Sequence, residues 1–237
     1  MISKIKDIHG KEHIIDYNNF KSCFINCDCM EALRKMPDKC VDLSICDPPY
    51  GGNDAIGLKD NNNLSKQAAN RKAYKVFENI APTQEYFDEL KRVSKRQIIW
   101  GVNFYEAKGL RGGRIVWDKH GTAFGRAEEA YYSDSKSIEI FEYTWNGMIQ
   151  ENMKDKEYRI HPTQKPVALY EWLLNRYAKP GDKILDTHVG SASSLIACRN
   201  TNHKYVGFEI DETYYALAKD RLDRESAQMN IFDFIKE

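Results

Sequence analysis

The sequence predicts an α/β fold built on a largely parallel sheet. Short apolar and β-branched runs alternate along the chain with segments of helical periodicity, which is the pattern of successive strand–helix units. Some of these runs end in an acidic residue, at the edge of a parallel sheet where ligands usually bind. With 237 residues, 42% of them hydrophobic, the chain can bury a sizeable core. No repeat or linker interrupts the pattern, so we expect a single domain over residues 1–237.

Seven segments are candidate strands because they are short, apolar and rich in β-branched or aromatic residues. They span residues 22–26, 41–46, 97–102, 114–118, 138–145, 183–187 and 204–210. Helical periodicity fits residues 29–36, 83–95, 165–177, 193–199 and 212–226. The segment 51–76 is rich in Gly, Asn and Lys and has no sustained apolar period, so we expect a mobile surface loop there. Loops of this length inside a compact domain are often functional.

The overall composition narrows the class of protein. The chain has 35 basic and 35 acidic residues, which argues against a polybasic tail but leaves nucleic-acid binding open. Its six cysteines lie mostly in apolar runs and suggest reduced thiols in a cytoplasmic protein. Cys27 and Cys29 have no second cysteine pair or histidine cluster to complete a zinc site, so we expect no metal. The sequence shows neither a signal peptide nor an apolar segment long enough for a membrane span.

The stretch "KILDTHVGSASSLIA" (183–197) predicts a strand, a tight turn and a helix. Asp186 ends the strand, and Gly190 allows a turn conformation that is costly for other residues. Hydroxyl groups that could cap the helix or donate to a ligand carboxylate follow at Ser191, Ser193 and Ser194. This turn could hold one end of a small ligand, although an ordinary strand–turn–helix would look similar.

Glu209 ends the next strand, in "YVGFEID" (205–211). An acid about twenty residues after such a turn can accept hydrogen bonds from both hydroxyls of a ribose. The dinucleotide fingerprint G-x-G-x-x-G is absent, because the turn reads Gly190-Ser191-Ala192. A mononucleoside cofactor is therefore favoured over a dinucleotide.

Asp47, Pro48, Pro49 and Tyr50 follow the apolar run 41–46. The prolines stiffen the turn and hold the Pro48 carbonyl out as an acceptor beside the Asp47 carboxylate. Two neighbouring acceptors suit an amino group on a ring, and Tyr50 offers a face on which a base could stack for about 1–3 kcal/mol. The alternative is a Pro-Pro turn with a capping Asp.

This arrangement suits chemistry on the exocyclic amine of adenine. That amine is a poor nucleophile, because its lone pair is delocalised into the ring. Accepting both amine hydrogens directs the lone pair at an electrophile and stabilises the positive charge that develops on nitrogen. Alignment of the amine with a methyl donor could contribute a further ~7–11 kcal/mol.

Four motifs together resemble the S-adenosylmethionine-dependent, amino-directed DNA methyltransferases. They are "DPPY" (47–50), "HPTQKPVAL" (161–169), "LDTHVGSASS" (185–194) and "GFEID" (207–211). The catalytic motif precedes the cofactor motif, as in the circularly permuted β-group of that family, and the similarity extends over residues 22–222. The resemblance implies a Rossmann-like methyltransferase fold: a seven-stranded, mostly parallel sheet with helices on both faces and one antiparallel strand.

The resemblance also implies a role for individual residues. Those that hold and stack the target base are Asp47, Pro48, Pro49 and Tyr50. Those that bind the cofactor are Asp28 at its adenine edge, Glu209 at its ribose, and Thr163, Lys165, Asp186, Gly190, Ser191 and Ser193 around its methionine portion. Asp47, His188, Ser194 and Asp211 complete the cofactor set.

The cofactor turn departs from the family pattern at two places. Family members commonly carry Asp-Pro-Phe and Gly-Ser-Gly where this chain has Asp186-Thr187-His188 and Gly190-Ser191-Ala192. We expect the Ala192 methyl group to lie near the tail of the cofactor and to weaken its binding. His188 could still pack against the cofactor in place of the aromatic ring.

The implied partner is double-stranded DNA, from which the target base must be flipped. Candidate phosphate contacts in the loop are Lys66, Arg71, Lys72 and Lys75. Residues of about 120–160 form a small candidate target-recognition segment, and its small size favours a homodimer. Asp47 in this motif favours adenine N6, and the family suggests a restriction–modification or phage setting in a bacterial or phage-infected cytoplasm. Cytosine-N4 methylation, RNA methylation and a catalytically weakened DNA-binding homologue are the alternatives.

Overall fold

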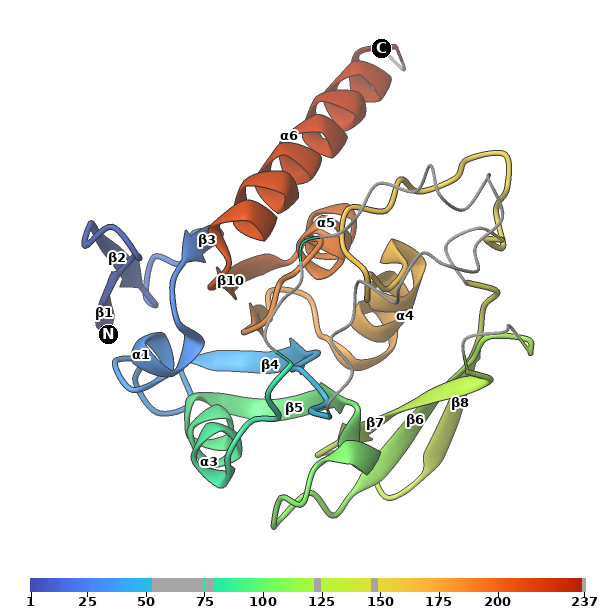
Figure 1. The fold of residues 1–237 in the computed structure, drawn as a ribbon. Coiled ribbons are helices and arrows are strands. Elements are labelled where there is room, and N and C mark those ends of the chain that lie inside the picture. The colour runs from blue at the N-terminus through green and yellow to red at the C-terminus, as the bar shows by residue number, and fades with distance from the viewer. Residues whose placement is uncertain (53–74, 76–78, 122–124, 146–148, 236–237) are drawn as a thin grey trace.

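A computed structural model describes residues 1–52, 75, 79–121, 125–145 and 149–235 (Figure 1). Within these residues, eight strands form the central sheet in the order β3-β10-β9-β4-β5-β7-β6-β8. Their bounds are β3 Cys23–Asn26, β4 Val41–Cys46, β5 Ser94–Trp100, β6 Gly113–Asp118, β7 Ala127–Tyr132, β8 Ile138–Glu142, β9 Lys183–Asp186 and β10 Lys204–Glu209. All run parallel except β7, which is antiparallel to both of its neighbours. The prediction of an α/β fold with one antiparallel strand is confirmed.

The central sheet has one strand more than the predicted seven. The additional strand is β7, with the sequence AEEAYY, whose two glutamates and two alanines have low strand propensity. Its pairing with β5 and β6 on either side overrides that local preference. A separate two-stranded hairpin, β1 (Ile2–Lys6) with β2 (Glu12–Asp16), was also not predicted.

Helices cover both faces of the sheet. The helices are α1 Cys29–Leu33, α3 Gln84–Val93, α4 Val167–Tyr177, α5 Ser193–Asn200 and α6 Glu212–Ile235, with a short 3₁₀ helix η2 at Val102–Phe104. One core joins the sheet to α4, α5 and the first part of α6, and the other joins it to α1, α3 and the hairpin. Along β5, Ile98 and Trp100 pack into the first core and Ile99 into the second, which is the alternation expected of a strand buried on both faces.

The parallel strands bring distant acids to one edge of the sheet. β3, β10, β9 and β4 are successive neighbours and point the same way. Their carboxyl ends therefore lie at a common edge, where Asp47, Asp186 and Glu209 end or follow their strands and Asp28 follows β3.

Three further features concern the cysteines, the helices and the position of α6. All six cysteines are free thiols, in agreement with the predicted reduced state. Among the described helices, none combines the length and apolar character needed to cross a membrane. In Figure 1, α6 extends well beyond the body of the sheet.

Candidate active site

Asp47 is paired by a residue that lies 118 positions away in the sequence. Its Oδ2 atom accepts a hydrogen bond from Lys165 Nζ at 2.7 Å, and its Oδ1 atom accepts one from the Tyr50 hydroxyl at 2.8 Å. The Lys165 side chain is only 4% exposed. The carboxylate that ends β4 therefore has both of its oxygens engaged. Lys165, which was predicted to lie beside the methionine portion of the cofactor, lies here against Asp47, the predicted catalytic acid.

A second carboxylate, Glu128 on β7, shares these partners. Lys165 Nζ lies 2.8 Å from Glu128 Oε2 and 3.0 Å from the Tyr50 oxygen, so the ammonium has an acceptor for each of its three hydrogens. Lys119 donates to the other oxygen, Glu128 Oε1. Two carboxylates thus face two ammonium groups, and the cluster has no net charge.

The lysines affect the two carboxylates differently. Burial raises the pKa of Asp47 above its usual value, and the charge of Lys165 opposes this effect. Burial alone would also raise the pKa of Glu128, but Lys165 and Lys119 outweigh it and lower that pKa to about 2. Glu128 is therefore ionised throughout the neutral range.

The turn after β5 supports the Asp-Pro-Pro-Tyr segment. The Tyr105 hydroxyl donates to the Pro48 carbonyl at 2.8 Å, and the Phe104 ring stacks on the Tyr50 ring at 4.8 Å with an interplanar angle of 12°. Gly101 has a φ of +72°, and a Cβ atom built there would lie 2.2 Å from the Tyr50 ring. Only glycine fits this position while the Tyr50 ring stays in place.

Asp186, at the end of β9, is buried, and each of its oxygens accepts one hydrogen bond. One oxygen accepts the backbone N–H of His188 at 2.9 Å, and the other accepts the Ser194 hydroxyl. Burial raises the pKa of Asp186 to about 7. The carboxyl therefore titrates near neutrality, and a cation placed beside it would favour its ionised form.

Glu209 closes the adjacent turn. Its Oε2 atom accepts the backbone N–H of Gly190 at 2.8 Å, and its Oε1 atom accepts that of Asp211 at 2.9 Å. Burial raises the pKa of Glu209. Asp211 in turn forms an ion pair with Lys75 at 2.7 Å. Lys75, a predicted DNA contact, is therefore held by Asp211 beside the predicted cofactor site. Its contact with DNA stays a prediction.

Arg221 of α6 joins the cofactor turn to the segment before α4. Its Nη1 atom donates to the Ser191 carbonyl at 2.8 Å and to the Ser193 hydroxyl at 2.9 Å. Its Nη2 atom pairs with Glu157 at 2.7 Å, and Glu157 accepts the N–H of Val167 at the start of α4. This buried ion pair holds two parts of the predicted cofactor site against each other.

Other predicted cofactor residues have structural partners. Asp28 Oδ1 accepts the N–H groups of Met30 and Glu31 and caps α1. His188 Nδ1 lies 2.9 Å from the Thr187 hydroxyl, and burial lowers the pKa of His188 to about 4, so the ring is neutral at pH 7. The Thr163 hydroxyl lies 3.1 Å from His161 Nδ1.

Ala192 lies in the interior, and its expected effect on cofactor binding stays a prediction. The residue adopts a left-handed conformation, with φ of +64°, and is fully buried in the core that underlies α4 and α5. Its methyl group is therefore not exposed to solvent in this structure.

Two groups of predictions, the DNA contacts in the loop and the recognition segment, are described by the structure only in part. Lys66, Arg71 and Lys72 lie outside the described residues, as does most of the expected mobile loop at 51–76. In the candidate recognition segment of about 120–160, residues 127–132 and 138–142 belong to the central sheet. Target recognition by this segment stays a prediction.

Sequence reasoning missed Glu128, Lys119 and Arg221. Glu128 lies in β7, which was not among the seven candidate strands, and its charged neighbour Glu129 obscures the alternation that distinguishes an inward side chain. Arg221 lies in a helix rich in exposed charge, where one buried arginine gives no distinct signal. No pattern in the sequence identifies these partners.

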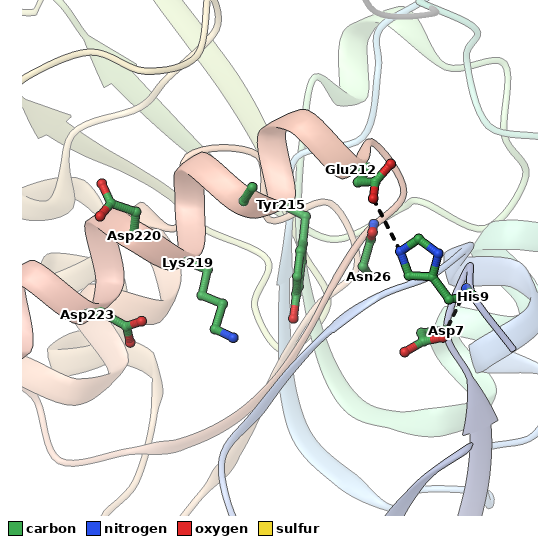
Figure 2. A pocket seen from close by; sticks show the side chains of 9 residues that line it. Asp7, His9, Asn26, Glu212, Tyr215, Lys219, Asp220 and Asp223 are labelled. Atoms are coloured by element: carbon green, nitrogen blue, oxygen red, sulfur yellow. Dashed lines mark hydrogen bonds and ion pairs between the residues drawn. The ribbon is translucent and has the colours of Figure 1, made fainter. Parts of the chain in front are cut away.

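A pocket of about 470 Å³, lined mostly by charged and polar residues, lies at the outer edge of β3, between the hairpin and α6 (Figure 2). It is lined by Asp7, His9, Asn26, Glu212, Tyr215, Ala216, Lys219, Asp220 and Asp223. An ion pair of 3.2 Å between His9 and Glu212 bridges one side. Four acids against one lysine and one histidine make this edge unfavourable for phosphate groups. We therefore do not expect DNA to bind here.

Comparison with known proteins identifies the class of enzyme. The model of the N6/N4 DNA methylase family, described as DNA methylase, matches residues 41–220. The chain belongs to this family.

Individual relatives agree with the family assignment. The chain is 26% identical to the type II methyltransferase M.HpaI of Haemophilus parainfluenzae, over 88% of this chain and 75% of that protein. It is 24% identical to YubD of Escherichia coli K12, over 85% of this chain and 90% of that one.

Two solved structures show the same fold. The PvuII DNA methyltransferase (cytosine-N4-specific) has a TM-score of 0.54 at 13% identity, covering 89% of this chain and 92% of that one. The M1.HpyAVI–SAM complex has a TM-score of 0.52 at 20% identity, covering 84% and 98%. The predicted Rossmann-like methyltransferase fold is confirmed.

Proposed function

We propose that the protein transfers a methyl group from S-adenosylmethionine to the 6-amino group of an adenine flipped out of double-stranded DNA. The observation that carries this proposal is the position of Asp47. Asp47 precedes Pro48 in the chain and follows β4, at the same sheet edge as the acids that end β9 and β10. Membership of the DNA methylase family supplies the substrate class.

The residues at this edge fit the cofactor. Gly190 adopts the left-handed conformation that glycine favours at a turn, and a Cβ atom built there would lie in van der Waals contact with the His161 ring, at 3.8 Å. Glu209 would hold the ribose hydroxyls and Asp28 the adenine edge. Asp186, Ser191 and Thr163 would hold the methionine portion. Ser193 and Ser194 would support the turn, through hydrogen bonds to Ser191 and to Asp186. Bound S-adenosylmethionine supplies a sulfonium methyl group, whose S–C bond breaks as the new N–C bond forms.

Asp47 and Pro48 would act on the target amine. Each accepts one amine hydrogen, which directs the nitrogen lone pair out of the base plane and stabilises the charge that develops there. The Tyr105 hydroxyl uses one lone pair of the Pro48 carbonyl and leaves the other for the amine. The methylated amine then loses one proton to solvent, so Asp47 need not be a strong base.

Tyr50 would stack on the flipped base. One face of its ring is covered by Phe104, whose side chain is 54% exposed. A base stacking on this face would displace Phe104, and an exposed side chain can move at low cost.

The order of motifs along the chain supports assignment to the permuted β-group, since β4 with Asp47 precedes β9 with Asp186. We propose further that Lys66, Arg71 and Lys72 contact DNA phosphates. The homodimer, the restriction–modification or phage setting and the bacterial or phage cytoplasm remain predictions.

The test uses the full chain, labelled S-adenosylmethionine and either duplex DNA or structured RNA. Mass spectrometry of the digested product would distinguish N6-methyladenine from N4-methylcytosine. We expect N6-methyladenine in DNA only. Transfer to RNA alone, or no transfer despite cofactor binding measured by calorimetry, would contradict the proposal.

A further inference from the structure

The catalytic carboxylate lacks a free oxygen in this structure. Asp47 Oδ1 accepts from the Tyr50 hydroxyl at 2.8 Å and Oδ2 from Lys165 at 2.7 Å. A carboxylate oxygen that already serves a strong donor is a weaker acceptor for another. Asp47 Oδ1 keeps a second lone pair for the target amine, and it is a stronger acceptor for that amine when the Tyr50 hydroxyl has an alternative partner.

The Tyr50 hydroxyl has such a partner. It carries one hydrogen and lies within hydrogen-bond distance of two carboxylate oxygens, Asp47 Oδ1 at 2.8 Å and Glu128 Oε2 at 3.0 Å. It can donate to only one of them at a time, while its oxygen accepts from Lys165. Rotation of the hydroxyl hydrogen about the C–O bond changes the acceptor without moving a heavy atom.

Glu128 is held ready for this exchange. Lys119 binds its Oε1 atom and Lys165 its Oε2 atom, and Lys119 also lies 4.6 Å from the centre of the Trp117 ring. Because both lysines stabilise the charged form, the pKa of Glu128 is lowered to about 2 and the group remains an acceptor at neutral pH.

We infer that Glu128 is a positioning residue, which accepts the Tyr50 hydroxyl hydrogen bond when the target amine binds and so frees Asp47 Oδ1 for that amine. This inference rests on the proposed function. It concerns the rate of methyl transfer and not the affinity for the cofactor, since Glu128 lies on β7, four strand positions from β10, on which Glu209 lies.

The decisive variant is the pair Lys119→Met/Glu128→Met. It removes the alternative acceptor and keeps the net charge of the cluster at zero, and a buried ion pair replaced by apolar side chains usually leaves the fold intact. Glu129→Gln is the matched control, because Glu129 is adjacent on the same strand and pairs instead with Arg114. Each is made in the wild-type and in the Tyr50→Phe background, where no hydroxyl occupies Asp47.

The readouts are single-turnover methyl transfer to unmethylated genomic DNA and calorimetry with S-adenosylmethionine. We expect the methionine pair to lower the transfer rate about tenfold to hundredfold. Cofactor affinity should stay within about threefold of wild type, and Glu128→Gln, whose amide oxygen can accept the same hydroxyl, should retain an intermediate rate. In the Tyr50→Phe background the methionine pair should change the rate by less than about threefold.

An equal loss of rate in both backgrounds, or a rate equal to that of Glu129→Gln, would overturn the inference. If thermal melting shows that the methionine pair does not fold, Glu128→Gln is compared across the same two backgrounds and must show the same dependence on Tyr50. Failure of the proposed function is seen separately, because wild-type protein would then transfer no methyl group to DNA.

Discussion

Arg221→Met should destabilise the protein strongly, because Arg221 is a buried partner of an ion pair. The guanidinium is 6% exposed and donates to Glu157, to the Ser191 carbonyl and to the Ser193 hydroxyl. Removing one partner of a buried ion pair costs about 3–5 kcal/mol, because the other charge is left buried and unpaired. Glu157 keeps 22% exposure, so water can partly solvate it and we expect the lower end, about 3 kcal/mol.

This loss is measurable as a shift in thermal unfolding. For a chain of this size, each kcal/mol lowers the Tm by about 2–4 °C, so Arg221→Met should lower it by about 6–12 °C. Adding Glu157→Gln removes the unpaired charge and should recover at least ~1 kcal/mol. The matched control is Arg224→Met, since Arg224 is exposed on the same helix and pairs with Asp220 at 3.0 Å. It should change stability by less than about 0.5 kcal/mol.

Urea unfolding of five proteins, wild type, Arg221→Met, Glu157→Gln, the double variant and Arg224→Met, shows whether the loss comes from the unpaired charge. Coupling between residues 157 and 221 is expected, because the second substitution repairs damage done by the first. Strictly additive losses, or equal losses for Arg221→Met and Arg224→Met, would refute the reasoning that a buried ion pair holds the cofactor turn in place.

Three further predictions test the site itself. Gly101→Ala places a Cβ atom 2.2 Å from the Tyr50 ring, so we expect about a hundredfold loss of methyl transfer with cofactor affinity retained in calorimetry; an unchanged rate would show that the ring tolerates displacement. Burial raises the pKa of Asp186 from 3.8 to about 7, so between these values the folded protein binds a proton that the unfolded chain does not. The free energy of unfolding should therefore fall as the pH rises from about 4 to about 7, by up to ~1.4 kcal/mol per pH unit. This contribution should be absent from Asp186→Asn in urea unfolding at several pH values, and parallel pH profiles for the two proteins would contradict the assignment. Ala192→Gly relieves a left-handed alanine at about 1–2 kcal/mol but loses a buried methyl group worth ~0.8 kcal/mol. Its cofactor affinity should stay within about threefold of wild type, and a large gain in affinity would mean that the methyl group does contact the cofactor.

Local patterns were sufficient to predict most of the fold. The runs 41–46 and 183–187 are apolar and bounded by turn residues, and they form the parallel neighbours β4 and β9. The failure at β7 has a physical cause. Its residues have weak strand propensity, and they are held in the sheet by pairing with β5 and β6, which lie elsewhere in the sequence.

The site was predicted only where its residues belong to a contiguous motif. Asp47 and Asp186 each end a strand, so the rule for parallel sheets brings them to one edge. The partners of Asp47 could not be predicted in the same way. Lys165 lies just before α4 and Glu128 on β7, and only the folded chain brings the Lys165 ammonium within hydrogen-bond distance of both carboxylates.

The comparison of Asp47→Asn with wild type tests the central claim most directly. The substitution keeps the size of the side chain but removes the carboxylate charge that would stabilise the amine in the transition state. With labelled S-adenosylmethionine and unmethylated DNA, we expect methyl transfer to fall at least about hundredfold while calorimetry shows cofactor affinity within about threefold of wild type. Methylation by Asp47→Asn at the wild-type rate would contradict the account.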